Sequence, residues 1–250
     1  MSLRRVCVAL FALLLGLSFA RPASALGPDG VGAPRVRTAA GIRVRTIEID
    51  PHNPRIRISI ATAKGFPLRD ETFGSMLGRV RPIVAIDGAY FSERSRQPIG
   101  DIVVNGRLQY AGMMGTALAM TRGGDALIER VVRNHRADWA GFDMVLGCGP
   151  ALVLDGEIVV DPVYEHFHDP HVMHATRRLG IAVLRNGDLL IVETAQAVTF
   201  KRWAHVMKAL GAQDALNLDA GASLAMTYRG HVLEHPKRRL TNLFVVLPRS

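Results

Sequence analysis

The chain has 250 residues, of which 48% are hydrophobic and 21% charged, and this balance excludes a disordered protein. Its formal net charge is +9, but the 31 lysines and arginines form no basic stripe interleaved with aromatic residues, so no nucleic-acid partner is expected. The charge suits a phosphate-bearing or acidic-glycan ligand at least as well.

The first 25 residues have the organisation of a secretory signal peptide. Arg4 and Arg5 precede an apolar run from Val6 to Ala20, and Ala23-Ser24-Ala25 supplies the small residues of a cleavage site. The run is shorter than the about 20 apolar residues of a transmembrane helix. The sequence predicts an exported protein, periplasmic or secreted, without a stable membrane span after cleavage. An uncleaved anchor is the alternative.

Cleavage after Ala25 would remove three arginines and Cys7 and lower the net charge to +6. Cys148 would remain as the sole cysteine, so no internal disulfide is expected. Residues 26–40 are rich in Gly, Pro and Ala and are predicted to be a flexible leader. The domain is then expected to span residues 41–250.

The domain begins with two segments in which apolar and polar residues alternate. Ile42 to Asp50 and Arg55 to Ile60 have the period of two typical of half-buried strands, and Pro51 to Pro54 predicts a hairpin turn between them. Thr72 to Val80 is consistent with a short helix. Further strands are predicted at Pro82–Ile86, Gly100–Val104, Thr116–Met120, Ala126–Val132, Ala151–Leu154, Glu157–Val160, Ile181–Leu184, Leu189–Val192, Asp214–Leu218 and Leu243–Leu247.

Three dipeptides predict hairpin turns, because their residues accept a positive φ: Asn105-Gly106, Asp155-Gly156 and Asn186-Gly187. A second helix is expected after Thr199, which can cap it, with an apolar face that ends before Gly211. The pattern predicts an α+β fold: a single domain with a mixed, largely antiparallel sheet flanked by helices.

Two of the predicted strands run into a carboxylate followed by small residues. Asp87-Gly88 follows the predicted strand Pro82–Ile86, and Asp219 follows the predicted strand Asp214–Leu218. A sheet holds such a carboxylate in place, and a neighbouring glycine lets a ligand approach the backbone. Alternatively, each aspartate only caps its turn.

These segments resemble the signature motifs of the phosphodiester glycosidase family. Ala85-Ile86-Asp87-Gly88-Ala89-Tyr90-Phe91 is similar to its Ala-Ile-Asn-Gly-Gly-Tyr-Phe, and Asn217-Leu218-Asp219-Ala220-Gly221-Ala222-Ser223 to its Asn-Leu-Asp-Gly-Gly-Gly-Ser. Gly147 to Val153 resembles its Ser-Gly-Gly-Pro-x-Leu-Val stretch, and the resemblance spans about residues 42–247. The family includes the enzyme that removes N-acetylglucosamine from a phosphodiester to uncover mannose 6-phosphate, and many exported bacterial proteins.

The resemblance implies a hydrolase that cleaves a sugar from a sugar 1-phosphodiester or a related envelope glycan. Glycoside cleavage usually needs two carboxyl groups, so Asp87 and Asp219 are the expected pair, with the choice of acid and base left open. Thr176 stands where the family has an arginine. Side chains two apart on a strand share a face, so Arg178 is expected on the phosphate and Arg177 is expected to point away.

The remaining candidate residues are expected to bind substrate. Of these, Asp101 and Glu193 can also be turn or surface residues. The substrate-binding candidates are Gly88, Tyr90, Asp101, Gly149, His174, Glu193, Gly221, Ser223 and Arg238.

No cofactor and no metal ligand is expected, although His166 to His174 carries four histidines and an aspartate that could bind a divalent metal. A loop that grips substrate or responds to pH is the other reading of this segment. Cys148 is expected to be a packed residue and not a nucleophile. Two rival functions stay open: a non-catalytic glycan-binding or envelope-binding protein on the same scaffold, and a metal-dependent hydrolase built on the histidines.

Overall fold

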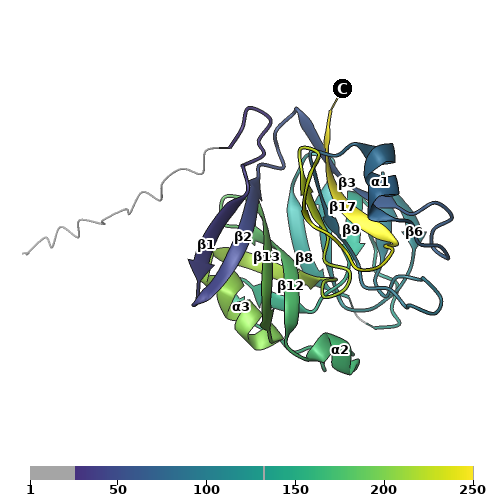
Figure 1. Ribbon diagram of the computed structural model, residues 1–250. Coiled ribbons are helices and arrows are strands. Elements are labelled where there is room, and N and C mark those ends of the chain that lie inside the picture. The colour runs from purple at the N-terminus through teal and green to yellow at the C-terminus, as the bar shows by residue number, and fades with distance from the viewer. Residues whose placement is uncertain (1–25, 132, 250) are drawn as a thin grey trace, which may run out of the picture.

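The computed structural model describes residues 26–131 and 133–249, and the predicted signal peptide lies outside them. Within these residues the chain is mostly β, with three sheets and short helices (Figure 1). No helix in this part of the chain has the length and apolar character needed to cross a membrane.

The largest sheet has seven strands in the order β1-β2-β13-β12-β14-β10-β11. The helix α3 (Phe200–Ala209) packs on one face of it, and its buried Trp203 fills the space left by Gly180 of the sheet. Thr199 caps the helix by accepting a hydrogen bond from the Arg202 backbone, as predicted. The strands are β1 (Arg35–Ala39), β2 (Ile42–Ile49), β10 (Ala151–Leu154), β11 (Glu157–Ile158), β12 (Thr176–Leu184), β13 (Leu189–Val198) and β14 (Ala212–Leu218).

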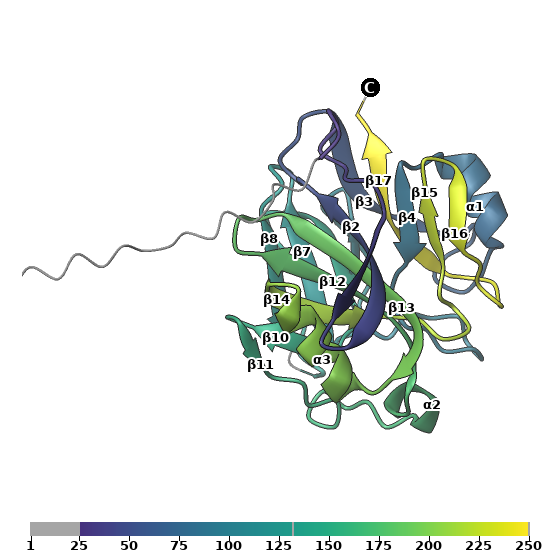
Figure 2. The same ribbon diagram turned by 60° about the vertical axis from the view of Figure 1, so that its left-hand side comes forward.

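The second sheet has the order β16-β15-β4-β17-β3, and α1 (Phe73–Val80) lies beside it (Figure 2). The third sheet has the order β6-β5-β9-β7-β8. The short helix α2 (Pro170–Met173) precedes β12. The strands of these sheets are β3 (Ile56–Thr62), β4 (Val84–Asp87), β5 (Ile102–Val104), β6 (Arg107–Tyr110), β7 (Thr116–Thr121), β8 (Ala126–Arg130), β9 (Phe142–Gly147), β15 (Met226–Tyr228), β16 (His231–Glu234) and β17 (Asn242–Pro248).

One hydrophobic core joins the three sheets. It contains Ile86 of β4, Leu146 of β9 and Leu216 of β14, each fully buried and each from a different sheet. Burial of such side chains is the main favourable term in folding. The core therefore fixes the ends of these three strands relative to one another.

The three predicted hairpin turns are confirmed. Asn105 and Gly106 join β5 to β6 with positive φ, and Asp155 and Gly156 join β10 to β11 in the same way. Gly187 supplies the positive φ between β12 and β13. These turns are local features, so the residue types alone specify them.

The hairpin predicted across residues 42–60 is wrong. β2 pairs with β1 and β13, whereas β3 pairs with β17 in another sheet. An alternating pattern shows that a strand has one buried face but does not choose its neighbour. The segment between Asp50 and Arg55 therefore carries the chain from one sheet to the next.

The segment predicted as a flexible leader is structured, because residues 35–39 form β1 and Val31 is buried in the core.

The sheets are also not mixed as predicted. Every strand pair among the described residues is antiparallel, and the helices are few, so the fold is mostly β with antiparallel sheets.

Candidate functional site

The two predicted aspartates lie where strands from different sheets end together. Asp87 is the last residue of β4, and Asp219 follows the last residue of β14. The backbone nitrogen of Asp219 donates to the carbonyl oxygen of Gly88 at 3.0 Å. Cys148, directly after β9, accepts from the backbone nitrogen of Tyr90 at 3.4 Å through Sγ. The three sheets thus meet at one site.

Both carboxylates are buried, with Asp87 1% and Asp219 3% exposed. Asp219 accepts from the backbone nitrogen of Ala220 at 2.8 Å and from Nη2 of Arg238 at 3.0 Å. Oδ2 of Asp87 has no hydrogen-bond partner within the described residues. Native proteins rarely leave a buried polar atom unpartnered, because its desolvation is not repaid. Asp87 therefore keeps one oxygen available to a ligand.

Arg238 forms ion pairs or hydrogen bonds with three residues around the two aspartates. Besides Asp219, it donates through Nε to the hydroxyl oxygen of Ser223 at 2.5 Å. Its Nη1 pairs with Glu93, an exposed residue of the turn after β4. The guanidinium also lies 4.7 Å from the ring centroid of Phe91, a cation–π distance. These contacts fix a positive charge directly beside the carboxylates.

Burial raises the pKa of both aspartates. The pKa of Asp87 is raised well above its ordinary value by burial and by the negative charge of Asp219. The pKa of Asp219 rises to about 6 by burial, although Arg238 and Ser223 oppose the rise. Asp219 has the ion pair and Asp87 has the unpartnered oxygen. A proton shared by the pair therefore resides on Asp87.

Asn242, the first residue of β17, explains why a glycine follows Asp87. Its Oδ1 accepts from the backbone nitrogen of Ala89 at 2.8 Å. A Cβ atom on Gly88 would lie 2.1 Å from this oxygen, so a larger residue would displace the amide. The backbone after Asp87 is therefore held by packing as well as by hydrogen bonds.

Tyr90 and Asn217 lie beside the two aspartates. The Tyr90 hydroxyl accepts from Nδ2 of Asn217 at 2.8 Å, and its ring lies 5.8 Å from that of Phe167 between centroids.

Burial raises the pKa of the Cys148 thiol well above its ordinary value. A protonated thiol is a poor nucleophile, which agrees with a packed role for Cys148.

Most predicted substrate-binding residues lie in or next to this cluster. Gly149 donates from its backbone nitrogen to the carbonyl of Asn217 at 3.1 Å, and a Cβ atom there would lie 2.8 Å from the Thr116 nitrogen. Gly221 has a φ of +56°, which a side chain would disfavour. The predicted residues that the structure brings together with Asp87 and Asp219 are Gly88, Tyr90, Gly149, Gly221, Ser223 and Arg238.

Arg178, expected on the phosphate, is buried, and its guanidinium is bonded to backbone carbonyls. It is 1% exposed, and it donates to the carbonyl oxygens of Val198 at 3.1 Å, Val172 at 3.1 Å and His174 at 2.7 Å. Its guanidinium also stacks on the ring of Phe200 at 3.8 Å. These contacts hold the α2 segment against β13, and the guanidinium also interacts with the side chain of Tyr90 in the site.

Arg177 reaches the site, although it was expected to point away. It donates through Nη2 to the carbonyl oxygen of Gly221 at 2.6 Å. The alternation of faces fails here because the pairing register with β13 shifts between Thr176 and Arg178. Arg177 therefore supports the loop that carries Asp219.

Glu193 belongs to a separate network of ion pairs. Arg45 lies 2.7 Å from Glu193 and 3.1 Å from Glu234. Arg177 joins the network at 3.4 Å from Glu234. Burial raises the pKa of Glu193 to about 7. Glu193 is therefore linked to the loop after Asp219 through Arg45, Glu234 and Arg177, although its Oε2, like Oδ2 of Asp87, has no hydrogen-bond partner among the described residues.

Asp101 and His174 also lie apart from the cluster. Asp101 accepts from the backbone nitrogens of Gly112 at 2.9 Å and Met113 at 2.8 Å, and from Nε1 of Trp139 at 2.7 Å. His174 is exposed and contributes its carbonyl to Arg178. Asp101 is thus held by residues 11 to 38 positions away in sequence, and His174 contacts Arg178 four positions away through its backbone.

The histidine-rich segment borders the site through Phe167, which contacts Tyr90. The rings of His166 and His168 lie 6.4 Å apart between centroids. Within residues 26–131 and 133–249, no three His, Cys, Asp or Glu side chains are grouped to hold a metal ion.

Sequence reasoning missed several residues of the site. Glu93 lies in an exposed turn without a motif, and Arg177 was assigned to the wrong face. Asn242 and Asn217 stand in segments that resemble the family, and that resemblance was the only available signal for them.

Several known structures share the fold of this chain. A hypothetical protein from Synechocystis superposes with a TM-score of 0.76 at 17% identity, covering 88% of this chain and 62% of that one. The catalytic domain of zebrafish N-acetylglucosamine-1-phosphodiester α-N-acetylglucosaminidase, auto-inhibited by its pro-peptide, gives 0.69 at 17% identity, covering 88% and 82%. A candidate exported protein from Burkholderia pseudomallei gives 0.56 at 15% identity, covering 87% and 75%.

At these identities the structures establish the fold alone, and this chain spans less than two thirds of the Synechocystis protein. No curated protein sequence matches the chain. The family model for phosphodiester glycosidases matches residues 81–247, a segment that begins before Asp87 and ends after Asn242. The chain belongs to the phosphodiester glycosidase family.

Proposed function

We propose that this protein hydrolyses a sugar 1-phosphodiester, releasing the sugar from the phosphate. Water adds at C1 of the sugar, the bond from C1 to the phosphate oxygen breaks, and the phosphate leaves as a monoester. The observation that carries the proposal is the pair of buried, mutually coupled carboxylates, Asp87 and Asp219, beside the guanidinium of Arg238.

The two carboxyl groups suit different roles. Asp87, with the more strongly raised pKa, is the proton donor to the leaving phosphate oxygen. Asp219, held ionised by Arg238 and the Ala220 backbone, assists attack at C1. A phosphodiester is already a fair leaving group, so orientation by a cation matters as much as proton donation.

Arg238 is the residue we assign to the phosphate. Its Nη1 faces outward to Glu93, which is exposed, while Nη2 and Nε face the buried cluster. An arginine binds a phosphate through two parallel N–H groups, as it binds a carboxylate. The substrate phosphate would therefore replace the Glu93 carboxylate on Arg238.

We place this reaction outside the cytoplasm, on a glycan of the cell envelope. The signal-peptide pattern of residues 1–25 supports export, and the net positive charge of the chain suits a phosphate-bearing substrate. Hydrolysis by two carboxyl groups needs no diffusible cofactor, which fits a compartment without a nucleotide pool.

The experiment is hydrolysis of N-acetylglucosamine 1-(methyl phosphate) by the purified protein, with free sugar measured. Turnover by the wild type, lost in both Asp87→Asn and Asp219→Asn and unaffected by a chelator, is the expected result. Binding of the diester without turnover would instead identify the rival, a non-catalytic glycan-binding protein. Loss with chelator and recovery with zinc would point to a metal-dependent hydrolase.

A further inference from the structure

A groove of about 340 Å³ lies next to Arg238 and outside the carboxylate cluster. Two segments far apart in sequence form it: residues 72–74 at the beginning of α1, and residues 235–239 between β16 and β17. We call it the basic groove.

The groove is lined by cations and by no acidic residue. Lys237, Arg238, Arg239 and His235 contribute the ionisable side chains. Arg239 is paired with Asp70 at 2.7 Å, outside the lining. No carboxylate in the described part of the chain pairs with Lys237, which is exposed. An anion entering the groove would therefore meet at least one uncompensated positive charge.

The groove and the candidate active site share one continuous segment. Arg238 lines the groove and also binds Asp219 at 3.0 Å. The backbone nitrogen of Lys237 donates to the carbonyl of Ala222 at 2.7 Å, which ties the groove to the loop after Asp219. The group esterified to a phosphate on Arg238 would thus lie next to the groove.

We propose that the basic groove is a subsite for a second anionic group, a phosphate on the leaving side of the substrate. The natural substrate would then carry more than one phosphate, as in a glycan whose repeats are joined through phosphates. Lys237 is the residue that determines this preference. The proposal deepens the proposed function and rests on it.

The test compares two diesters of N-acetylglucosamine 1-phosphate, one methyl and one 2-phosphoethyl. The wild type is expected to hydrolyse the phosphoethyl diester with the higher kcat/KM, through a lower KM. Lys237→Gln should reduce that preference about three- to fivefold, the effect of one partly exposed charge pair. High salt should reduce it in the wild type as well, because exposed charges are screened.

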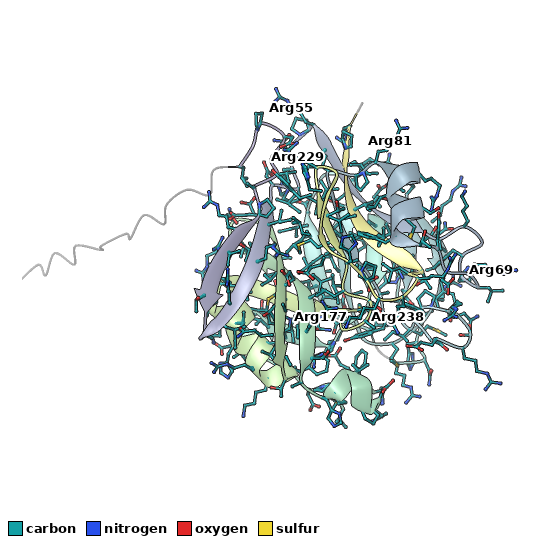
Figure 3. The ribbon with its side chains drawn as sticks, viewed as in Figure 1. Arg55, Arg69, Arg81, Arg177, Arg229 and Arg238 are labelled. Carbon is teal, nitrogen blue, oxygen red and sulfur yellow. The ribbon has the colours of Figure 1, made fainter. Side chains whose placement is uncertain are left out.

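Arg81→Gln is the matched control. It also removes one exposed positive charge, but at the far end of α1, and Figure 3 shows Arg81 well away from Arg238. The control is expected to keep the wild-type preference. Equal KM values for the two diesters in the wild type, or equal losses in Lys237→Gln and Arg81→Gln, would overturn the subsite.

Binding of tripolyphosphate, measured by calorimetry, separates this proposal from the proposed function. If neither diester is hydrolysed, the proposed function fails. Tripolyphosphate that binds more weakly to Lys237→Gln than to Arg81→Gln would still support an anion site in the groove. Tripolyphosphate that binds equally to both variants would contradict it.

Discussion

Two buried aspartates of this protein have opposite surroundings. Asp101 and Asp87 are each 1% exposed. Asp101 accepts three hydrogen bonds, from two backbone nitrogens and from Trp139, whereas Oδ2 of Asp87 accepts none within the described residues. A carboxylate with its acceptors filled stabilises the fold, whereas Asp87 combines an open oxygen with a second carboxylate, Asp219, where the three sheets meet.

The same contrast separates two arginines. Arg178 is buried and donates to three backbone carbonyls, whereas Arg238 is partly exposed and pairs with the replaceable side chain of Glu93. Figure 3 labels Arg238 and Arg177 in the same part of the molecule, around the loop after Asp219. The residue type alone therefore does not indicate which arginine is functional. What distinguishes the two is whether the guanidinium N–H groups are already bonded to the backbone.

The largest expected effect is loss of turnover in Asp87→Asn and Asp219→Asn. Each should lower kcat by about 10²–10⁴-fold, because an amide neither donates a carboxyl proton nor carries the negative charge. Thermal unfolding should show little change for Asp87→Asn, which replaces a protonated carboxyl, and a loss of stability for Asp219→Asn, which breaks the ion pair with Arg238. Asp101→Asn is the matched control, and its folded fraction should retain specific activity.

Arg178→Lys is expected to reduce stability by about 3 kcal/mol, since a lysine cannot donate to three separate carbonyls from one plane. Urea unfolding measures the effect. Arg185→Lys, at an exposed position in the turn after β12, should stay within about 0.5 kcal/mol of the wild type. A stable Arg178→Lys protein that binds phosphate more weakly would show that Arg178 is a substrate ligand after all.

Asp101→Asn is expected to reduce stability by about 2 kcal/mol. The asparagine has only one acceptor oxygen, so its NH₂ group would face either the Trp139 N–H or the backbone N–H groups, donor against donor. Trp139→Phe removes the same hydrogen bond from the other side and should have a smaller effect. Asp138→Asn, exposed on the same loop, is the control. Equal unfolding free energies for Asp101→Asn and Asp138→Asn would refute the structural role.

Glu193→Gln is expected to have the smallest effect, about 1 kcal/mol or less near neutral pH. The folded-state pKa of Glu193 is about 7, above its ordinary 4.5. The folded protein thus binds more protons than the unfolded chain in that window, and this group's contribution to stability falls as pH rises from 4.5 to 7. Unfolding free energies at several pH values should lose this slope in the variant. An unchanged slope would contradict the raised pKa.

The local features of the fold were predictable from sequence. Asn-Gly and Asp-Gly dipeptides specify hairpin turns, and Thr199 with the apolar spacing after it specifies α3. Pairing between distant strands was not predictable, because the period of two in β2 and β3 is compatible with any antiparallel neighbour. β1 was missed because Gly and Pro in the preceding residues dominate the composition.

The candidate site was predictable in part. Asp87 and Asp219 stand out because each ends a buried strand before small residues, and the family resemblance adds Ser223 and Arg238. Arg177 was expected on the wrong face because a register shift between Thr176 and Arg178 interrupts the alternation on which the inference rests. The three donors to Asp101 lie 11 to 38 residues away, so no local pattern indicates them.

The most direct test of the central claim is a titration of the aspartate side-chain carboxyl carbons by carbon-13 NMR, with Asp87→Asn and Asp219→Asn used for assignment. The coupled pair predicts that Asp219 titrates near pH 6 and that Asp87 is still protonated there. Two carboxyl groups that are both ionised by pH 5 would contradict a shared proton at this site.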